Sequence, residues 1–458
     1  MVTRPSARHR GRGFTFVLGL VLMTCMVSLG VALCWVANTS VAQSRNLKQI
    51  QAAQLQAESG LAFVTQQLAQ AELPIAGEGF ILFDALAGCL SASLDGSGTL
   101  GGRAIAYDGN TLTIPEITAN AADGSFSAVI SMPDAHRMHV VVTGRAGAVV
   151  RSLGIGFKPE GGHPIFGFGI SSKGPICLEN TIKVLGANYT DEARLLSTSP
   201  GQAFRLLNNL EIHGDVYASD PNATVNINGT GTIAGVSMAS PAVMDHVHIG
   251  EGFPDFPEID VSVFEPFATN IVNINTVTSG TRSFSNIRIA AGTNPTFSGV
   301  IDINGVVYIE APNKVTFGDG TTVTGVIVTQ QGVGAKKDNE IKFEMNTSSN
   351  GVEALPDTGQ FHDLREMGGA FILAPGFTVR FENDSGVLNG IVAADAVKFE
   401  NAFTGKLYGG ILCYGSDEFM AENLTNFTID HSKYPKYLAG FKVDPRKLVP
   451  EPNSYVEY

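Results

Sequence analysis

One uncharged apolar segment near the start of the chain constrains the fold more than any other feature. Residues 14–37 contain no acidic or basic residue, and the preceding leader, 1–13, contains four arginines and no acid. About 20 such residues are enough to cross the hydrocarbon core as a helix. Basic residues favour the cytoplasmic side. The sequence therefore predicts a single inner-membrane span over 14–37, with the leader cytoplasmic and the bulk of the chain in the periplasm or at the cell surface.

Three kinds of N-terminal segment fit this pattern. A plain signal anchor needs only the apolar run. A cleaved secretory signal would use the small residues of 37–42, ANTSVA, as its cleavage site. The third kind is a prepilin-type leader: Gly13 lies directly before Phe14, with Thr15 and Phe16 after it. That arrangement resembles the leader and mature start of type IV pilins, in particular of minor pilins and pseudopilins.

This resemblance implies partners and roles for the residues that carry it. A prepilin peptidase would cut after Gly13 and leave Phe14 as the mature N-terminus. Phe14, Thr15 and Phe16 would then pack against neighbouring pilin-like subunits. The family usually has Glu as its fifth mature residue, whereas this chain has Leu18 at that position. Because Leu18 removes the charge thought to pair with a neighbouring N-terminal amine, the resemblance points to a tip or accessory subunit.

The segment after the apolar run is predicted to be a second stretch of helix. Residues 38–73 contain no Pro and one Gly, and they are rich in Gln and Ala, which are good helix formers. Pro74 is expected to end the helix. A stripe at alternating spacings of three and four marks one face: Leu47, Ile50, Gln54, Ala57, Leu61, Val64 and Leu68. We therefore expect an amphipathic helix over 38–73 that continues the membrane helix, similar to the long N-terminal helix of pilin-like proteins.

Composition limits both the function and the secondary structure expected for the remaining chain. The formal net charge is −13, which argues against nucleic-acid binding because that function needs a basic surface. Charged residues make up only 16% of the chain and Gly occurs 52 times, which favours short strands and tight turns. Cys25 and Cys34 lie in the apolar run, while Cys89, Cys177 and Cys413 show no paired spacing typical of a metal site.

The second half of the chain contains an internal repeat. A Gly followed by apolar residues recurs at spacings of 20, 44, 21 and 20 residues, where 44 is interpreted as two periods around a polar insertion, 333–350. The five sites are Gly305, Gly325, Gly369, Gly390 and Gly410. A Val-x-Phe element precedes several of them, at Val315–Phe317, Val379–Phe381 and Val397–Phe399. Earlier, Gly214 and Gly235 begin similar runs 21 residues apart, with Val225–Asn228 between them.

A period near 20 predicts a mainly β fold with a parallel β-solenoid, or β-helix, in which stacked coils share one core. An antiparallel β-sandwich or jelly roll is the alternative. The predicted parts are a β-rich region at 75–170, first coils at 171–240, a linker or excursion at 241–294, the main solenoid at 295–418, and a C-terminal cap or tail at 419–458. Strands are expected at 137–143 and 146–157. The solenoid pattern resembles that of bactofilin-like envelope domains.

A search for catalytic and ligand sites finds no enzyme signature. Polygalacturonase-like β-helices carry closely spaced Asp pairs and a Gly-His-Gly, and neither occurs in this sequence. The alternate histidines of Asp245-His246-Val-His248 could ligate a metal, but no third ligand is local, so a polar loop is the favoured interpretation. Gly318-Asp-Gly320 and 95–98 are interpreted as turns, since calcium loops need more acids. The sequence thus predicts a non-catalytic protein with no cofactor and no metal.

Three functional hypotheses follow. The first is a membrane-anchored structural or accessory protein of a type IV pilus or type II secretion-like system that displays a non-catalytic solenoid. The second is a membrane-tethered carbohydrate-binding or polysaccharide-active β-helix, which would need carboxylates gathered on one face. The third is a scaffold that polymerises end to end, against which the tail after residue 419 argues.

Overall fold

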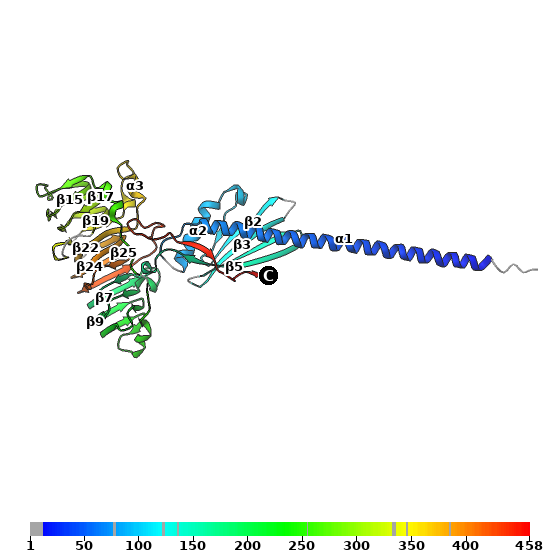
Figure 1. The fold of residues 1–458 in the computed structure, drawn as a ribbon, viewed down its shortest axis with the longest axis horizontal. Helices are drawn as coiled ribbons and strands as arrows, with labels where there is room; N and C mark the ends of the chain where they lie inside the picture. Colours follow the sequence, from blue (N-terminus) through cyan, green and yellow to red (C-terminus); the bar gives the residue numbers. More distant parts are fainter. Residues whose placement is uncertain are drawn as a thin grey trace, which may run out of the picture.

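The structure, a computed structural model, describes residues 12–76, 79–120, 124–134, 137–253, 255–331, 336–344, 347–383 and 386–458. The first 11 residues of the predicted leader, 1–13, therefore lie outside the described residues. Figure 1 shows three parts in line: helix α1 (Arg12–Gln70), an antiparallel sheet packed against its second half, and a domain of stacked strands beyond it. A mainly β chain with a long apolar N-terminal helix is thus confirmed.

Helix α1 runs without a break through the predicted boundary between 37 and 38, and it ends four residues before Pro74. Its second half buries one face, formed by Ala53, Ala57, Gly60, Val64 and Leu68. The predicted stripe is therefore confirmed at three of these positions. It is wrong at Leu47, which is 61% exposed. The predicted stripe also did not include the small residues Ala53 and Gly60, which let the sheet lie close to the helix.

The antiparallel sheet follows α1 in the chain. Its strands lie in the order β1-β2-β3-β4-β5-β29, with β30 also paired to β5. The strands are β1 (Ala106–Tyr107), β2 (Thr111–Asn120), β3 (Gly124–Asp134), β4 (Arg137–Ala146), β5 (Val149–Glu160), β29 (Lys447–Pro450) and β30 (Val456–Glu457). Strands β4 and β5 confirm the two predicted here. In β4 the side chains of Met138, Val140 and Val142 alternate into the core shared with α1.

The region predicted to be β-rich also contains a helix, α2 (Phe80–Leu94). Leu82, Leu86, Leu90 and Leu94 recur every four residues and are buried against α1 and the sheet. This is the spacing of one helical face. The region predicted to be β-rich at 75–170 therefore begins with a helix that the prediction did not include, and its strands start at Ala106.

The domain of stacked strands, called here the parallel-strand domain (170–429), is one 23-stranded sheet. Before the chain crosses the stack, the strands are β6 (Ile170–Ser172), β7 (Ile176–Gly186), β8 (Leu195–Ser197), β9 (Gln202–Ile212), β10 (Val216–Ala218), β11 (Thr224–Ile233), β12 (Val236–Ser237) and β13 (Val247–Ile249). After the crossing they are β14 (Asn270–Val272), β15 (Arg282–Ile289), β16 (Thr296–Phe297), β17 (Ile301–Ile309), β18 (Lys314–Phe317), β19 (Thr321–Thr329), β20 (Glu340–Phe343), β21 (Ser348–Asn350), β22 (Ala370–Glu382), β23 (Gly386–Asn389), β24 (Ile391–Glu400), β25 (Thr404–Tyr408), β26 (Ile411–Cys413), β27 (Phe419–Glu422) and β28 (Thr425–Ile429). A short helix, α3 (His362–Arg365), interrupts this series.

Most strand pairs of this domain are parallel, and their registers explain the sequence repeat. Gly305 lies opposite Gly325, so one period of 20 residues is one step of the stack. The spacing of 44 is also one step, because Ile327 pairs directly with Ile372. The interpretation of that gap as two periods is therefore wrong. The insertion predicted there contains β20, whose Phe343 is an unrecognised member of the Val-x-Phe ladder.

The earlier repeat is different in kind. Val236 and Ser237 after Gly235 form an antiparallel hairpin with the end of β11, and Ala234 and Gly235 both have positive φ, 49° and 79°. Such values are typical of tight hairpin turns. The run after Gly214 instead pairs in parallel with β8 and β13. Gly214 and Gly235 are therefore not equivalent positions, and this hairpin makes the sheet mixed.

The spatial order of the strands differs from their order in the chain. The last strands, β26 and β27, pair with the first, β6 and β7, in the middle of the stack. The early strands extend from this point to β13 at one end. The chain then crosses over and returns inward from β14 at the other end. The crossing segment is 255–269, shorter than the predicted 241–294, because β13, β14 and β15 already belong to the stack.

The strands that carry the repeated Gly followed by apolar residues are apolar on both faces, because other parts of the protein pack on both faces. Inward residues such as Val307 and Ile327 join the inner core, while outward residues such as Val306 and Val328 pack against the crossing segment and residues 434–441. Near-continuous apolar runs are the expected signature of strands buried on both faces. Tyr414 Oη donates to Pro257 O at 2.7 Å, which ties the crossing segment to the stack.

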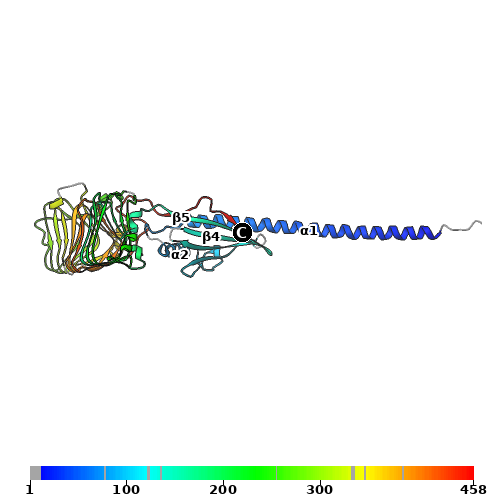
Figure 2. The ribbon, with the colours of Figure 1, turned by 90° about the horizontal axis from the view of Figure 1, so that it is seen from below.

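The predicted C-terminal cap at 419–458 is wrong. Residues 419–422 and 425–429 form β27 and β28 inside the stack, where both pair with β7. The chain then passes over the outer apolar face and adds β29 and β30 to the antiparallel sheet. Figure 2 shows this return, with the C-terminus beside β5 and the stacked strands at the far end. The tail joins the two domains and does not cover an open end of the stack.

A buried polar cluster fastens the first strands to the last. The carboxylate of Glu192 is fully buried and accepts hydrogen bonds from the backbone N–H groups of Asn188 (2.7 Å) and His431 (2.8 Å). Asn188 Nδ2 also donates to Asp430 Oδ1 at 3.0 Å. Although burial alone would raise it, hydrogen bonds from Lys406 and Ser432 lower the pKa of Asp430 to about 2. Asp430 therefore stays ionised at any ordinary pH.

His431 predicts an acid-sensitive step in this cluster. Burial, and secondarily the Arg194 guanidinium, lower its pKa to about 3. The unfolded chain takes up this proton near pH 6.5 and the folded chain only near pH 3, so stability falls as the pH drops through that window. We expect about 2 kcal/mol to be lost between pH 6.5 and 5.0 through this residue. His431→Phe, measured by urea unfolding at both pH values, should lack that loss. An equal pH slope in both proteins would contradict this.

Candidate functional site

The first half of α1 is the most unusual surface of the chain. From residue 16 to 49 its side chains are exposed, among them Phe16 (72%), Leu18 (52%) and Trp35 (71%). Residues 12–15, which include the predicted cleavage position Gly13-Phe14 and Thr15, already belong to the helix. Within the described residues, α1 is the one helix long and apolar enough to cross a membrane. An apolar surface of this extent requires lipid or another apolar partner.

Two glycines set the contact between the second half of α1 and the sheet. A Cβ added at Gly144 of β4 would lie 2.2 Å from Ala53 O and 2.4 Å from Ala57 N. A Cβ added at Gly60 of α1 would lie 2.6 Å from the Phe126 ring. The backbone of the helix therefore rests directly on β4. This fixes the direction in which the apolar half of α1 leaves the folded part of the chain.

The predicted histidine pair is brought onto a single aspartate. Asp215 Oδ1 lies 2.9 Å from His246 Nδ1, and Asp215 Oδ2 lies 3.0 Å from His248 Nε2. His248 also stacks on Tyr217, with ring centroids 4.5 Å apart. The sequence reading missed Asp215, 31 residues before His246, which the parallel pairing of β10 with β13 places here. Asp245, the acid of the predicted motif, is not one of the residues that these hydrogen bonds join.

The contact among Asp215, His246 and His248, called here the first latch, lies where the chain leaves the stack. Across the described residues, no group of three or more His, Cys, Asp or Glu side chains is arranged to hold a metal ion. One carboxylate shared by two imidazoles connects β13 to the start of β10. The polar-loop interpretation needs a correction here, since Val247–Ile249 is a strand.

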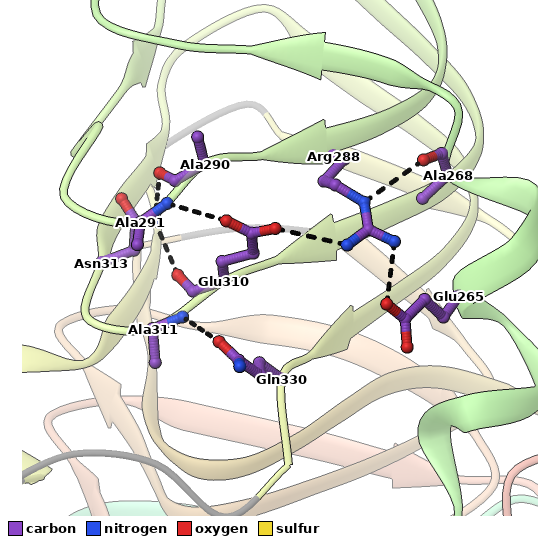
Figure 3. Close-up of polar contacts among 9 residues, drawn as sticks. All are labelled: Glu265, Ala268, Arg288, Ala290, Ala291, Glu310, Ala311, Asn313 and Gln330. Carbon is purple, nitrogen blue, oxygen red and sulfur yellow. Dashed lines mark hydrogen bonds and ion pairs between the residues drawn. The ribbon is translucent and has the colours of Figure 1, made fainter.

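A second latch lies at the opposite end of the crossing segment (Figure 3). Arg288 Nη2 lies 3.0 Å from Glu265 Oε1 in that segment, and Arg288 Nη1 lies 3.3 Å from Oε1 of Glu310, the residue that follows β17. The guanidinium also covers the Tyr308 ring at 4.6 Å. Polar side chains thus tie the chain to the stack just before the crossing segment and again near its end.

The remaining predicted positions have structural surroundings. Asp95 Oδ1 accepts from Ile105 N at 2.7 Å, and Gly320 turns the chain with φ of 80°. Cys413 is buried, and Cys177 Sγ donates to Glu418 Oε2 at 3.1 Å. Burial raises the pKa of both thiols to about 12, so they stay protonated and unreactive at neutral pH.

Comparisons with known proteins do not assign a family. No protein-family model matches the chain. No curated protein matches it either. Among solved structures, the chain is similar to the crystal structure of the competence-associated pilin ComZ from Thermus thermophilus, with a TM-score of 0.33 and 11% identity, over 88% of this chain and 98% of that one. A TM-score this low does not establish a shared fold.

Proposed function

We propose that the protein is a membrane-anchored, extracytoplasmic structural or accessory protein of a type IV pilus or type II secretion-like system. The observation that carries this proposal is α1, one uninterrupted helix whose first half exposes apolar side chains while its second half packs on a sheet. At 1.5 Å per residue its 59 residues extend about 88 Å, and a bilayer core needs about 30 Å of this. The two domains then stand outside an inner membrane, and the leader arginines lie on the cytoplasmic side.

We further propose that the parallel-strand domain is a non-catalytic β-solenoid. Its ladders support this, because Phe317, Phe343, Phe381 and Phe399 follow one another in register through parallel pairs. The proposal has two further parts. A prepilin peptidase cleaves the chain after Gly13. The segment that packs against pilin-like subunits then consists of Phe14, Thr15, Phe16 and Leu18. The absence of an acid at Leu18 favours a tip or accessory position in such an assembly.

Fractionation tests this function. The full chain, expressed with and without a pilus-assembly apparatus, should remain in the membrane fraction after high-salt and alkaline washing. Part of it should appear in the sheared surface-filament fraction only when the apparatus is present. The matched control is a chain in which Leu20, Leu22 and Leu29 of the apolar half are replaced by Asn, which should leave the membrane fraction. Release of the unaltered chain by salt alone would contradict a membrane anchor.

A further inference from the structure

A cationic pocket lies where the antiparallel sheet meets the parallel-strand domain. It has a volume of about 390 Å³. Arg137 at the start of β4, Lys158 near the end of β5 and Arg446 before β29 line it, together with His163 and a single carboxylate, Glu451. The lining thus carries three positive side chains and one carboxylate, and a second carboxylate, Glu160, pairs with Lys158. A concave site with an excess of one sign of charge concentrates counter-ions of the other sign.

Two of the cations at this pocket, Arg137 and Lys158, form ion pairs that remain open to solvent. Arg137 Nη2 lies 3.2 Å from Glu451 Oε1, and the Arg137 side chain is 61% exposed. Lys158 pairs with Glu160 at 3.1 Å, with both side chains close to half exposed. Exposed ion pairs of this kind contribute little to stability. The Glu451 carboxylate thus occupies the position that an incoming oxyanion would take.

The walls of the pocket come from the antiparallel sheet and from the segments that connect it to the parallel-strand domain. Ile75 and Ala76 are buried and give it an apolar side. His163 belongs to the entry of the parallel-strand domain, and its Nδ1 accepts from Ile165 N at 3.3 Å. Arg446 lies on the returning C-terminal chain, where it forms a β-bridge with Leu73. A ligand held here would contact the sheet, the domain entry and the return segment at once.

We propose that this junction pocket binds a small oxyanion-bearing ligand, a carboxylate or phosphate group on a molecule no larger than one sugar unit, and so fixes the two domains against each other. Arg137 and Lys158 supply the charge, and a guanidinium suits planar or tetrahedral oxyanions through paired N–H donors. The pocket is about 50 Å along α1 from residue 37. A lipid headgroup of the anchoring membrane is therefore out of reach, and the ligand is extracytoplasmic.

Titration of the full chain in detergent micelles tests this proposal. Inorganic phosphate and glucuronate are the probes, glucose is the neutral control, and ionic strength is held constant because it screens exposed charges. We expect a saturable rise in the thermal midpoint with at least one anion and none with glucose. A response to phosphate alone identifies a phosphoryl ligand, and a response to glucuronate alone identifies an acidic sugar. No saturable response to either anion would overturn the proposal.

Three variants separate binding from folding. Arg137→Gln combined with Lys158→Gln should weaken binding about tenfold or more, because both charge-assisted contacts are lost. Glu451→Gln should instead tighten binding several-fold, since it removes the competing carboxylate. Lys183→Gln, which breaks a pair with Glu211 at 2.6 Å on the parallel-strand domain, should change nothing. Unaltered affinity in the Arg137 and Lys158 double variant would overturn the assignment even if anions bind elsewhere.

Discussion

Gly144→Ala should destabilise the helix–sheet part of the protein by about 3 kcal/mol, although it adds one methyl group. That methyl would lie 2.2 Å from Ala53 O and 2.4 Å from Ala57 N. Both are backbone atoms of α1, so no side-chain rotation can relieve the overlap. The helix must lift away from β4, and Ala57 and Val64 then lose their packing against the sheet.

Amide hydrogen exchange in β3, β4 and β5 is the appropriate measurement. The single Trp of the chain, Trp35, lies in the exposed apolar half of α1 and reports nothing about the sheet. Gly88→Ala in α2 is the matched control, since its added Cβ meets nothing within 4 Å. It should be neutral or stabilise by up to about 1 kcal/mol. Unchanged protection of β4 in Gly144→Ala would mean that α1 does not rest on the sheet.

Phe381→Ala should destabilise the parallel-strand domain by about 4 kcal/mol. Phe381 is fully buried and stacks between Phe343, at 5.0 Å between ring centroids, and Phe399, at 4.8 Å. Removing the ring leaves a cavity between two steps of the stack. Parallel strands on either side limit how far this cavity can collapse, because their backbones are held in register by hydrogen bonds.

Urea unfolding followed by far-UV circular dichroism measures this loss. Phe381→Leu provides the control, because it keeps most of the volume and should cost only about 1–1.5 kcal/mol. The difference between the two variants isolates the cavity from the loss of ring stacking. A loss below about 1 kcal/mol for Phe381→Ala would contradict a continuous internal Phe ladder.

Patterns among residues close together in the sequence predicted α1 and the register of part of the parallel-strand domain. The apolar part of α1 follows from the uncharged run at 14–37, and the buried positions Ala57, Val64 and Leu68 follow from helical periodicity. The 20-residue spacing of Gly305 and Gly325 is the register of two adjacent strands. Helix α2 was also predictable from the sequence, because its leucines have helical spacing.

The order of the stack could not be predicted in the same way. Every step presents a similar Gly-apolar strand, so nothing local indicates that Ile411 pairs with Ile170 and not with a later residue. Contacts between distant groups accompany that pairing, such as the hydrogen bond from His431 N to Glu192, and they form only in the folded chain. The same limit applies to Asp215, whose contact with His246 and His248 depends on a pairing across 31 residues.

The mature N-terminus tests the central claim, that α1 is a processed membrane and assembly helix, most directly. The full chain would be expressed with and without a prepilin peptidase and its N-terminus determined by mass spectrometry, with Gly13→Leu as the uncleavable control. We expect a chain beginning at Phe14 only when the peptidase is present and Gly13 is intact. Retention of residues 1–13 in both hosts, or a start at Gln43, would contradict pilin-type processing.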